Sequence, residues 1–203
     1  MAEQMTPAKL APQRSALIGV ALVDVRDVAQ VEEAQLAARL ALRTTPQQIE
    51  RLLQWSGLAA PSRINSAVIT GGRAVVQLGP DEWLILADTE QPAAIAAAIA
   101  QSAGGIAHAL VDITDRNAGL VISGPAVEAC LATGCPLPLS LPAFPVGRAT
   151  RTLFGRAEIV LWRVGPERFH VETGRSFVPY LAGLIGAAIR DEAAIRRQAG
   201  GQS

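Results

Sequence analysis

The feature that most constrains the fold of this chain is a repeated order of predicted secondary structure. Each of two successive regions is predicted to form a strand, a helix, three further strands and a second helix. The first set covers 35–43, 46–57, 66–70, 73–78, 83–86 and 92–103. The second set covers 118–123, 125–133, 148–154, 158–164, 167–172 and 176–190. The matching order predicts an internal duplication.

A short turn motif marks the same point in both sets. Gly79-Pro80-Asp81-Glu82-Trp83 aligns with Gly165-Pro166-Glu167-Arg168-Phe169. In each case a Gly-Pro turn precedes an acidic residue and then an aromatic one, and a strand and an apolar helix follow. The agreement between local residues and element order supports the duplication.

Local patterns define several of these elements. Apolar residues alternate along 35–43, which favours a half-buried strand although the helix propensity of 32–35 competes. Thr45 and Gln48 frame Pro46 as a capping box, which predicts a helix starting at Pro46. Gly71-Gly72 predicts a hairpin turn between two strands. Gly104 predicts the end of the alanine-rich helix.

These elements predict the α+β class, because strands linked by hairpins pair antiparallel and each sheet must cover its apolar face with helices. We predict flexible tails at 1–13 and 196–203, a first α+β half at 14–113 and a second at 114–195. The apolar stretch 16–23 is predicted to be a strand and not a signal peptide. The longest apolar run, 178–189, is shorter than the roughly 18 residues needed to cross a bilayer.

Charge and lysine content exclude several functions. The 203 residues carry 18 basic and 18 acidic side chains, so the chain lacks the basic excess expected of a nucleic-acid binder. Lys9 is the only lysine, and it lies in the predicted N-terminal tail. This excludes a phosphate loop that needs an internal lysine, and also a pyridoxal-phosphate enzyme.

The cysteines and histidines do not form a recognisable metal motif. Cys130 and Cys135 lack the second closely spaced ligand pair of a zinc site, so we predict two reduced thiols in or beside a short helix, in a reducing cytoplasm. His108 and His170 lie in alternating apolar segments and are predicted to be strand residues. We assign neither histidine a catalytic or metal-binding role.

Two further groups of residues allow a functional or a structural interpretation. Asp112, Asp115 and Arg116 either bind a polar ligand or satisfy backbone groups at a turn, and we favour the turn. The three tryptophans are interpreted as packing residues, of which at least one is a candidate interface anchor: Trp55, Trp83 and Trp162. We find no paired nucleophile and base, and therefore assign no catalytic, cofactor-binding or metal-binding residues.

A long central segment resembles the folate-dependent aminomethyltransferases and their relatives. It comprises Val111-Asp112-Ile113-Thr114-Asp115-Arg116, the run from Ala118 to Ala126, Cys130-Leu131 and Cys135-Pro136-Leu137. Further segments make the chain similar to the gamma subunits of heterotetrameric sarcosine oxidases in particular: 78–84, 142–147, Thr152-Leu153, Leu161-Trp162-Arg163 and Arg175-Ser176-Phe177. The resemblance covers roughly residues 14–194.

The resemblance implies the aminomethyltransferase folate-binding fold in a subunit that carries no chemistry of its own. The chain would assemble with alpha, beta and delta subunits, and FAD, FMN, NAD, zinc and tetrahydrofolate would be bound by those partners. The complex would oxidise sarcosine to glycine with formation of hydrogen peroxide. No counterpart of the aminomethyltransferase Asn-Gly-Gly-x-x-x-Asp run is found here.

Other functions stay open from the sequence. The transferase-like segment 111–137 also fits an independent folate-binding or aminomethyl-transferring protein of one-carbon metabolism. A plain binding module of another complex is a weaker alternative. The missing catalytic constellation and a composition of 50% hydrophobic and 18% charged residues favour the assembly subunit.

Overall fold

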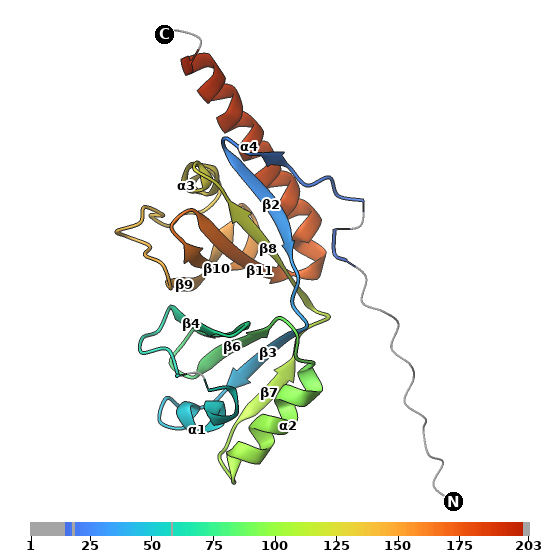
Figure 1. Ribbon diagram of the computed structural model, residues 1–203, viewed down its shortest axis with the longest axis vertical. Helices are drawn as coiled ribbons and strands as arrows, with labels where there is room; N and C mark the ends of the chain where they lie inside the picture. Colours follow the sequence, from blue (N-terminus) through green and yellow to red (C-terminus); the bar gives the residue numbers. More distant parts are fainter. Residues whose placement is uncertain (1–14, 18, 58, 201–203) are drawn as a thin grey trace, which may run out of the picture.

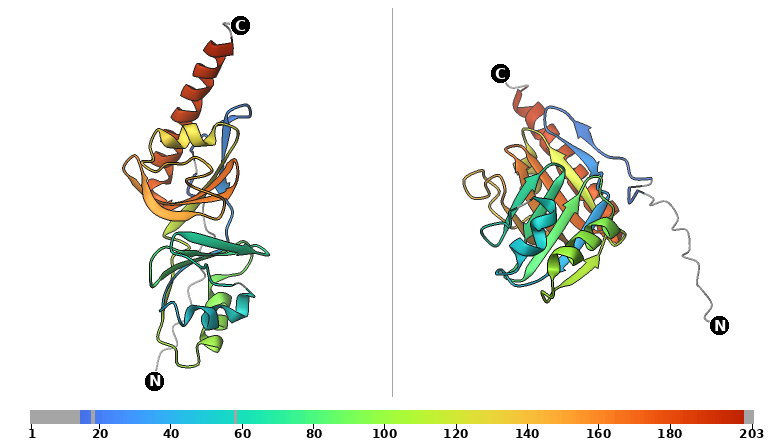
Figure 2. Two further views of the ribbon diagram at one scale, coloured as in Figure 1. Left: turned by 90° about the vertical axis from the view of Figure 1, so that its left-hand side faces the viewer. Right: turned by 60° about the horizontal axis from the view of Figure 1, so that its bottom comes forward.

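The computed structural model describes residues 15–17, 19–57 and 59–200, which form two antiparallel sheets stacked face to face between outer helices (Figure 1). The α+β class predicted from the sequence, with helices on one face of each sheet, is confirmed. Figure 2 shows the two sheets and the helices on their outer sides. Within the described residues, no helix is both long and apolar enough to cross a membrane.

The first sheet, here called sheet B, has the strand order β4-β5-β6-β3-β7. Its strands are β3 (Ala38–Arg43), β4 (Ser66–Thr70), β5 (Arg73–Gln77), β6 (Glu82–Ala87) and β7 (Ala109–Asp112). Its outer face is covered by α1 (Ile49–Leu53), the 3-10 turn η1 (Gln54–Ser56) and α2 (Pro92–Ala103). All neighbouring strands run antiparallel.

The second sheet, sheet A, has the order β1-β2-β8-β11-β10-β9. Its strands are β1 (Asp24–Val25), β2 (Ala29–Ala34), β8 (Asn117–Ser123), β9 (Ala149–Phe154), β10 (Ala157–Gly165) and β11 (Arg168–Gly174). It packs against α3 (Val127–Ala132) and α4 (Val178–Gly200), which follows the 3-10 turn η2 (Arg175–Phe177). The predicted duplication is confirmed, because β3-α1-β4-β5-β6-α2 and β8-α3-β9-β10-β11-α4 have the same order and strand pairing.

The two repeats exchange one strand each. β2 precedes β3 in the chain but pairs with β8 in sheet A, whereas β7 precedes β8 but pairs with β3 in sheet B. The chain therefore passes from sheet A to sheet B after Ala34 and back again after Asp112. Residues 24–34, which we predicted to belong to the first half at 14–113, are hydrogen-bonded into the sheet of the second half. The predicted boundary between the two halves, after residue 113, lies one residue beyond the end of β7.

Several local predictions are confirmed. Gly71 and Gly72 have φ of 58° and 77°, as a primed hairpin turn requires, and they join β4 to β5. The helix at 92–103 has the predicted bounds, and Gly104 ends it in the left-handed conformation. The strand at 35–43 is present as Ala38–Arg43.

Other local predictions are wrong. α1 begins at Ile49 and not at Pro46, and Gln48 makes no side-chain capping bond. Gln48 is itself the residue that precedes the first turn of α1, and its side-chain oxygen accepts from the Thr44 hydroxyl at 3.4 Å, so Thr45 and Gln48 do not form the capping box of this helix. Within 16–23, the described residues form turns and irregular chain instead of a strand. α4 continues to Gly200, so the part of the predicted 196–203 tail that the structure describes is helical.

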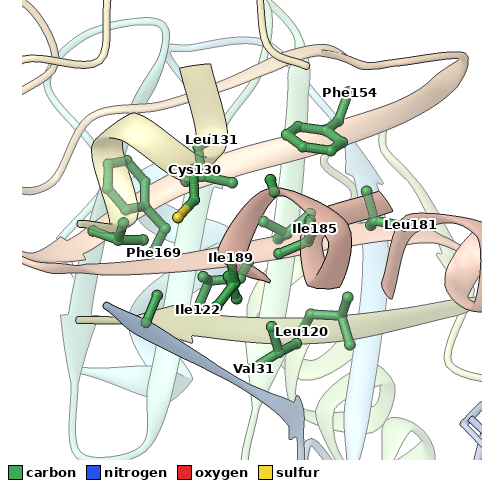
Figure 3. Packing of buried hydrophobic residues seen from close by; sticks show 14 of the residues in the cluster. Val31, Leu120, Ile122, Cys130, Leu131, Phe154, Phe169, Leu181, Ile185 and Ile189 are labelled. Carbon is green, nitrogen blue, oxygen red and sulfur yellow. The ribbon is translucent and has the colours of Figure 1, made fainter. Parts of the chain in front are cut away.

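Three apolar clusters hold the layers together. One lies between sheet A and its helices, the second between sheet B and its helices, and the third between the sheets. Figure 3 shows the first, in which α3 and α4 place Cys130, Leu181 and Ile185 over the strands. The third joins Val76 and Leu86 of sheet B to Trp162 of sheet A. Each sheet thus buries its outer face under its own helices and its inner face against the other sheet.

We predict that Ile185→Ala lowers the free energy of unfolding by about 2–5 kcal/mol, because it leaves a cavity at a fully buried position. Ile195→Ala on the same helix is the matched control. Ile195 is 60% exposed, so its truncation should change stability by less than about 0.5 kcal/mol. Urea denaturation followed by circular dichroism measures both, and equal effects would contradict the packing described here.

Candidate functional site

A buried ionic cluster lies between the two sheets. The Arg39 Nε of β3 donates to Glu172 Oε2 of β11 at 2.8 Å, and both side chains are almost fully buried. The Nε2 of His170 lies 2.7 Å from the other carboxylate oxygen of Glu172. These three side chains form a buried polar cluster that joins the two sheets, and we treat them and the neighbouring cleft as the candidate site.

Strand alternation positions the cluster. In β3, Leu40 and Leu42 pack toward the helices of sheet B, so Arg39 points toward sheet A. In β11, Phe169 and Val171 belong to the helix-facing cluster, which directs His170 and Glu172 toward sheet B. The cluster therefore requires the inner faces of both sheets.

Backbone groups and a glycine complete the surroundings. The Arg39 amide donates to Thr114 Oγ1 at 2.9 Å, and its Nη2 donates to the Ala34 carbonyl at 3.3 Å. Gly119 stands opposite Glu172 on β8, where an added Cβ would lie 2.4 Å from Glu172 Oε1. Glycine at this position leaves room for the carboxylate.

The electrostatics of the cluster favour an ionised Glu172. Burial raises the pKa of this carboxyl, but the hydrogen bond and charge of His170, together with the charge and hydrogen bond of Arg39, outweigh it, so the net pKa lies below its usual value. An ionised carboxylate accepts hydrogen bonds, which assigns the donating hydrogen to His170 Nε2. Both carboxylate oxygens are therefore occupied by donors.

A cleft of about 490 Å³ opens beside the cluster. His170 and Trp162 line one wall, and their rings lie 5.9 Å apart between centroids. Leu36 and Leu86 form part of the apolar surface opposite. The charged residues that line it carry both signs: Glu32, Glu33, Asp88, Arg73 and Arg168. The volume suits a small molecule, but the mixed charges do not define one ligand class.

The residues considered from the sequence are distributed over separate places. Asp112 Oδ1 accepts the Thr114 amide at 2.9 Å, and Arg116 Nε donates to Asn117 Oδ1 at 3.2 Å, in agreement with the turn interpretation. His170 lies in β11 as predicted. His108 instead precedes β7 and is exposed, with Nδ1 2.9 Å from the Ile106 carbonyl oxygen.

Cys130 lies in α3 and Cys135 just after it, and both thiols are free and buried, as predicted. Burial raises the pKa of Cys130, which disfavours the nucleophilic thiolate. Among the residues that the structure describes, no group of three or more His, Cys, Asp or Glu side chains is arranged to hold a metal ion.

The tryptophans divide into two environments. Trp83 and Trp162 are buried in the second and third apolar clusters, which confirms their interpretation as packing residues. Trp55 is partly buried, and the Arg73 guanidinium lies 5.4 Å from its ring centroid. Trp55 packs against the helix-facing cluster of sheet B.

Sequence reasoning missed Arg39 and Glu172. In the alternation along 35–43, Arg39 falls on the face opposite Leu40 and Leu42, and Glu172 is the last residue of the predicted strand 167–172, so neither pattern indicates burial. The sequence did contain one usable signal. Arg39 lies within an apolar strand segment, and a charged side chain that is buried in such a strand requires a partner. The partner lies 133 positions away in sequence.

The fold defines the class of protein. The structure is similar to the glycine cleavage system aminomethyltransferase T of Bartonella henselae, with a TM-score of 0.61 and 15% identity over 79% of this chain and 46% of that one. It is also similar to a chain of the heterotetrameric sarcosine oxidase from Corynebacterium sp. U-96 in complex with pyrrole 2-carboxylate. There the TM-score is 0.79, with 24% identity over 88% of this chain and 95% of that one. The chain thus has the aminomethyltransferase-like folate-binding fold.

The sequence comparisons specify the family. Residues 45–190 match the sarcosine oxidase, gamma subunit family. The sarcosine oxidase subunit gamma of Corynebacterium sp. (strain P-1) is 29% identical over 74% of this chain and 75% of its own length. That of an Arthrobacter species is 32% identical over 57% of this chain and 56% of its own length. The chain belongs to the sarcosine oxidase gamma subunit family, as the resemblance in its sequence indicated.

We predict that Glu172→Gln lowers the free energy of unfolding at neutral pH by about 3–5 kcal/mol, because it leaves the buried Arg39 without a counter-charge. Arg39→Met combined with Glu172→Gln should recover part of this loss. Urea denaturation of the two variants and the parent provides the test. A double variant less stable than Glu172→Gln by the full cost of a second independent defect would contradict the pairing.

The cluster also predicts a pH dependence. A carboxyl whose folded-state pKa is lowered stabilises the fold above its unfolded pKa, and this contribution is lost as pH falls from about 4.5 toward the folded value. The two should therefore change in parallel above about pH 5.5, and the parent should lose more stability than Glu172→Gln as pH falls below about 4.5. Parallel slopes of unfolding free energy against pH in that lower range would show that Glu172 is not the group responsible.

Proposed function

We propose that this chain is the noncatalytic gamma subunit of a heterotetrameric sarcosine oxidase. The complex would oxidise sarcosine to glycine with formation of hydrogen peroxide and pass the one-carbon unit to tetrahydrofolate. The observation that carries the proposal is the family match over residues 45–190, within a fold that spans 95% of the matched chain of the Corynebacterium enzyme.

The assignment of partners and cofactors belongs to the same proposal. Alpha, beta and delta subunits would complete the complex, and FAD, FMN, NAD, zinc and tetrahydrofolate would be held by those chains. We propose no catalytic, cofactor-binding or metal-binding residue in this chain. Two observations support this. Each oxygen of the Glu172 carboxylate already accepts a hydrogen bond from a side chain of the cluster, and burial raises the pKa of the Cys130 thiol, which disfavours its nucleophilic form.

We propose a cytoplasmic location for the complex. The two cysteines are free thiols, which is the usual state in a reducing compartment.

The proposed subunit role also agrees with the exposure of several large apolar side chains at the surface, among them Ile64, Ile69 and Val111.

Copurification tests the subunit role. The chain, tagged at its N-terminus and expressed in its own cells, should emerge with stoichiometric partner chains and a flavin absorbance spectrum. The isolated chain should show no flavin absorbance. Recovery of a colourless monomer from those cells would overturn the proposal.

An independent folate-binding or aminomethyl-transferring protein is the alternative, favoured by the aminomethyltransferase-like fold and the cleft between the sheets. Titration of the isolated chain with tetrahydrofolate, followed by calorimetry, separates the two functions. We expect no saturable heat of binding. Saturable binding that is lost in a variant with a filled cleft, Ala74→Trp, would favour the alternative.

A further inference from the structure

We propose that the groove between residues 62–68 and 145–148 binds an acidic segment of a partner subunit that also inserts an apolar side chain. The inference rests on the proposed function and specifies the surface and the chemistry of one contact within the complex. It is argued from the geometry of the groove, the rigidity of its walls and the charge of its lining.

The groove lies where the two repeats meet. It has a volume of about 260 Å³, with one wall leading into β4 of sheet B and the other leading into β9 of sheet A. The Ala67 amide donates to the Gly147 carbonyl at 2.8 Å, and the Ala149 amide donates to the Asn65 carbonyl at 3.0 Å. Backbone hydrogen bonds between the repeats therefore hold the two walls at a defined separation.

The backbone at these contacts is conformationally unusual. Asn65 has φ of 64°, and among the described residues it is the only one other than glycine with a positive φ. Gly147 opposite it has φ of 86°. The Asn65 side-chain oxygen accepts a hydrogen bond from Thr150 Oγ1 at 3.0 Å, which holds the left-handed turn in place.

A buried arginine holds the loop that forms the second wall. The connection between α3 and β9 extends from the body of the molecule (Figure 1). Arg163 of β10 is fully buried beneath it, donates to the carbonyls of Leu139 and Pro166, and pairs with Glu128 at 2.7 Å. Its guanidinium lies 4.4 Å from the ring centroid of Phe169. The ion pair and the hydrogen bonds that offset the cost of burying the Arg163 charge therefore also anchor this loop.

The lining of the groove is positively charged and partly apolar. Arg63 and Arg148 are exposed, and within the described residues their guanidinium groups make no ion pair. The lining contains no aspartate or glutamate. Ile64 and Val146 are 46% and 50% exposed and flank the arginines.

This combination indicates the chemistry of the occupant. Exposed arginines in a rigid setting bind carboxylates through paired hydrogen bonds, and arginine is enriched at the energetic centres of protein interfaces. The apolar side chains favour a partner that covers them and excludes water from the ion pairs. An acidic segment with one apolar anchor satisfies both requirements, whereas a small inorganic anion would leave Ile64 and Val146 uncovered.

Site-specific crosslinking in the assembled complex identifies the occupant. A photoreactive phenylalanine derivative replaces Val146 in the tagged chain, and the crosslinked peptide is sequenced by mass spectrometry. We expect a peptide from a copurifying subunit that contains aspartate or glutamate near the crosslinked residue. A peptide from a second copy of this chain, or the absence of any crosslink in a complex that still assembles, would overturn the proposal.

Charge reversal measures the contribution of the two arginines. Arg63→Glu combined with Arg148→Glu should reduce recovery of the partner subunits by more than about tenfold, because the new carboxylates in the groove would repel the carboxylates of the partner's acidic segment. The matched control is Arg26→Glu with Arg156→Glu, which reverses two exposed arginines outside the groove and should leave recovery unchanged. Thermal unfolding of the isolated variants establishes that both remain folded.

The outcomes separate this inference from the proposed function. If the parent chain recovers no partner subunits, the subunit role itself fails. If the parent and the groove variant recover them equally, the role stands and the groove proposal is wrong. If the groove variant loses only bound sulfate in a titration of the isolated chain while partner recovery is unchanged, the groove is an anion site and the partner assignment is wrong.

Discussion

The ion pair between Arg39 and Glu172 is the interaction on which the arrangement of the two sheets depends. Two stacked sheets exclude water from the surface between them, and a charge buried there must be neutralised and hydrogen-bonded. Arg39 comes from sheet B, whereas Glu172 and His170 come from sheet A. The cluster thus disfavours any other register between the sheets, because a shift would leave at least one charge without its partner.

Strand exchange places both crossings of the chain between the sheets beside this ion pair. β2 and β7 each pair in the sheet formed by the other repeat, so the backbone crosses between the layers close to Arg39 and Thr114. On the opposite side, hydrogen bonds between 65–67 and 147–149 join the repeats. The two repeats consequently behave as one structural unit with a buried polar link at one side and a rigid groove at the other.

Much of the local structure could be predicted, because its causes lie within a few residues. Gly71-Gly72 specifies a turn that needs two positive φ values, and Pro92 with Gly104 delimits a helix. Prediction failed where a local signal competed with packing. The apparent capping box at Thr45 and Gln48 does not start the helix, which begins at Ile49. At 32–35, where helix propensity competed with the strand pattern, the chain ends strand β2, because β8 provides its hydrogen bonds.

The sequence by itself determined the class of the fold, the duplicated order of elements and the family, since these are written in periodicity, turn residues and short motifs. Only the tertiary structure decided which sheet receives β2, which charges are buried, and that Arg63 and Arg148 face one groove. The physical reason is that hydrogen-bond pairing between strands and neutralisation of buried charge join residues far apart in the chain. No local pattern records which distant partner will satisfy them.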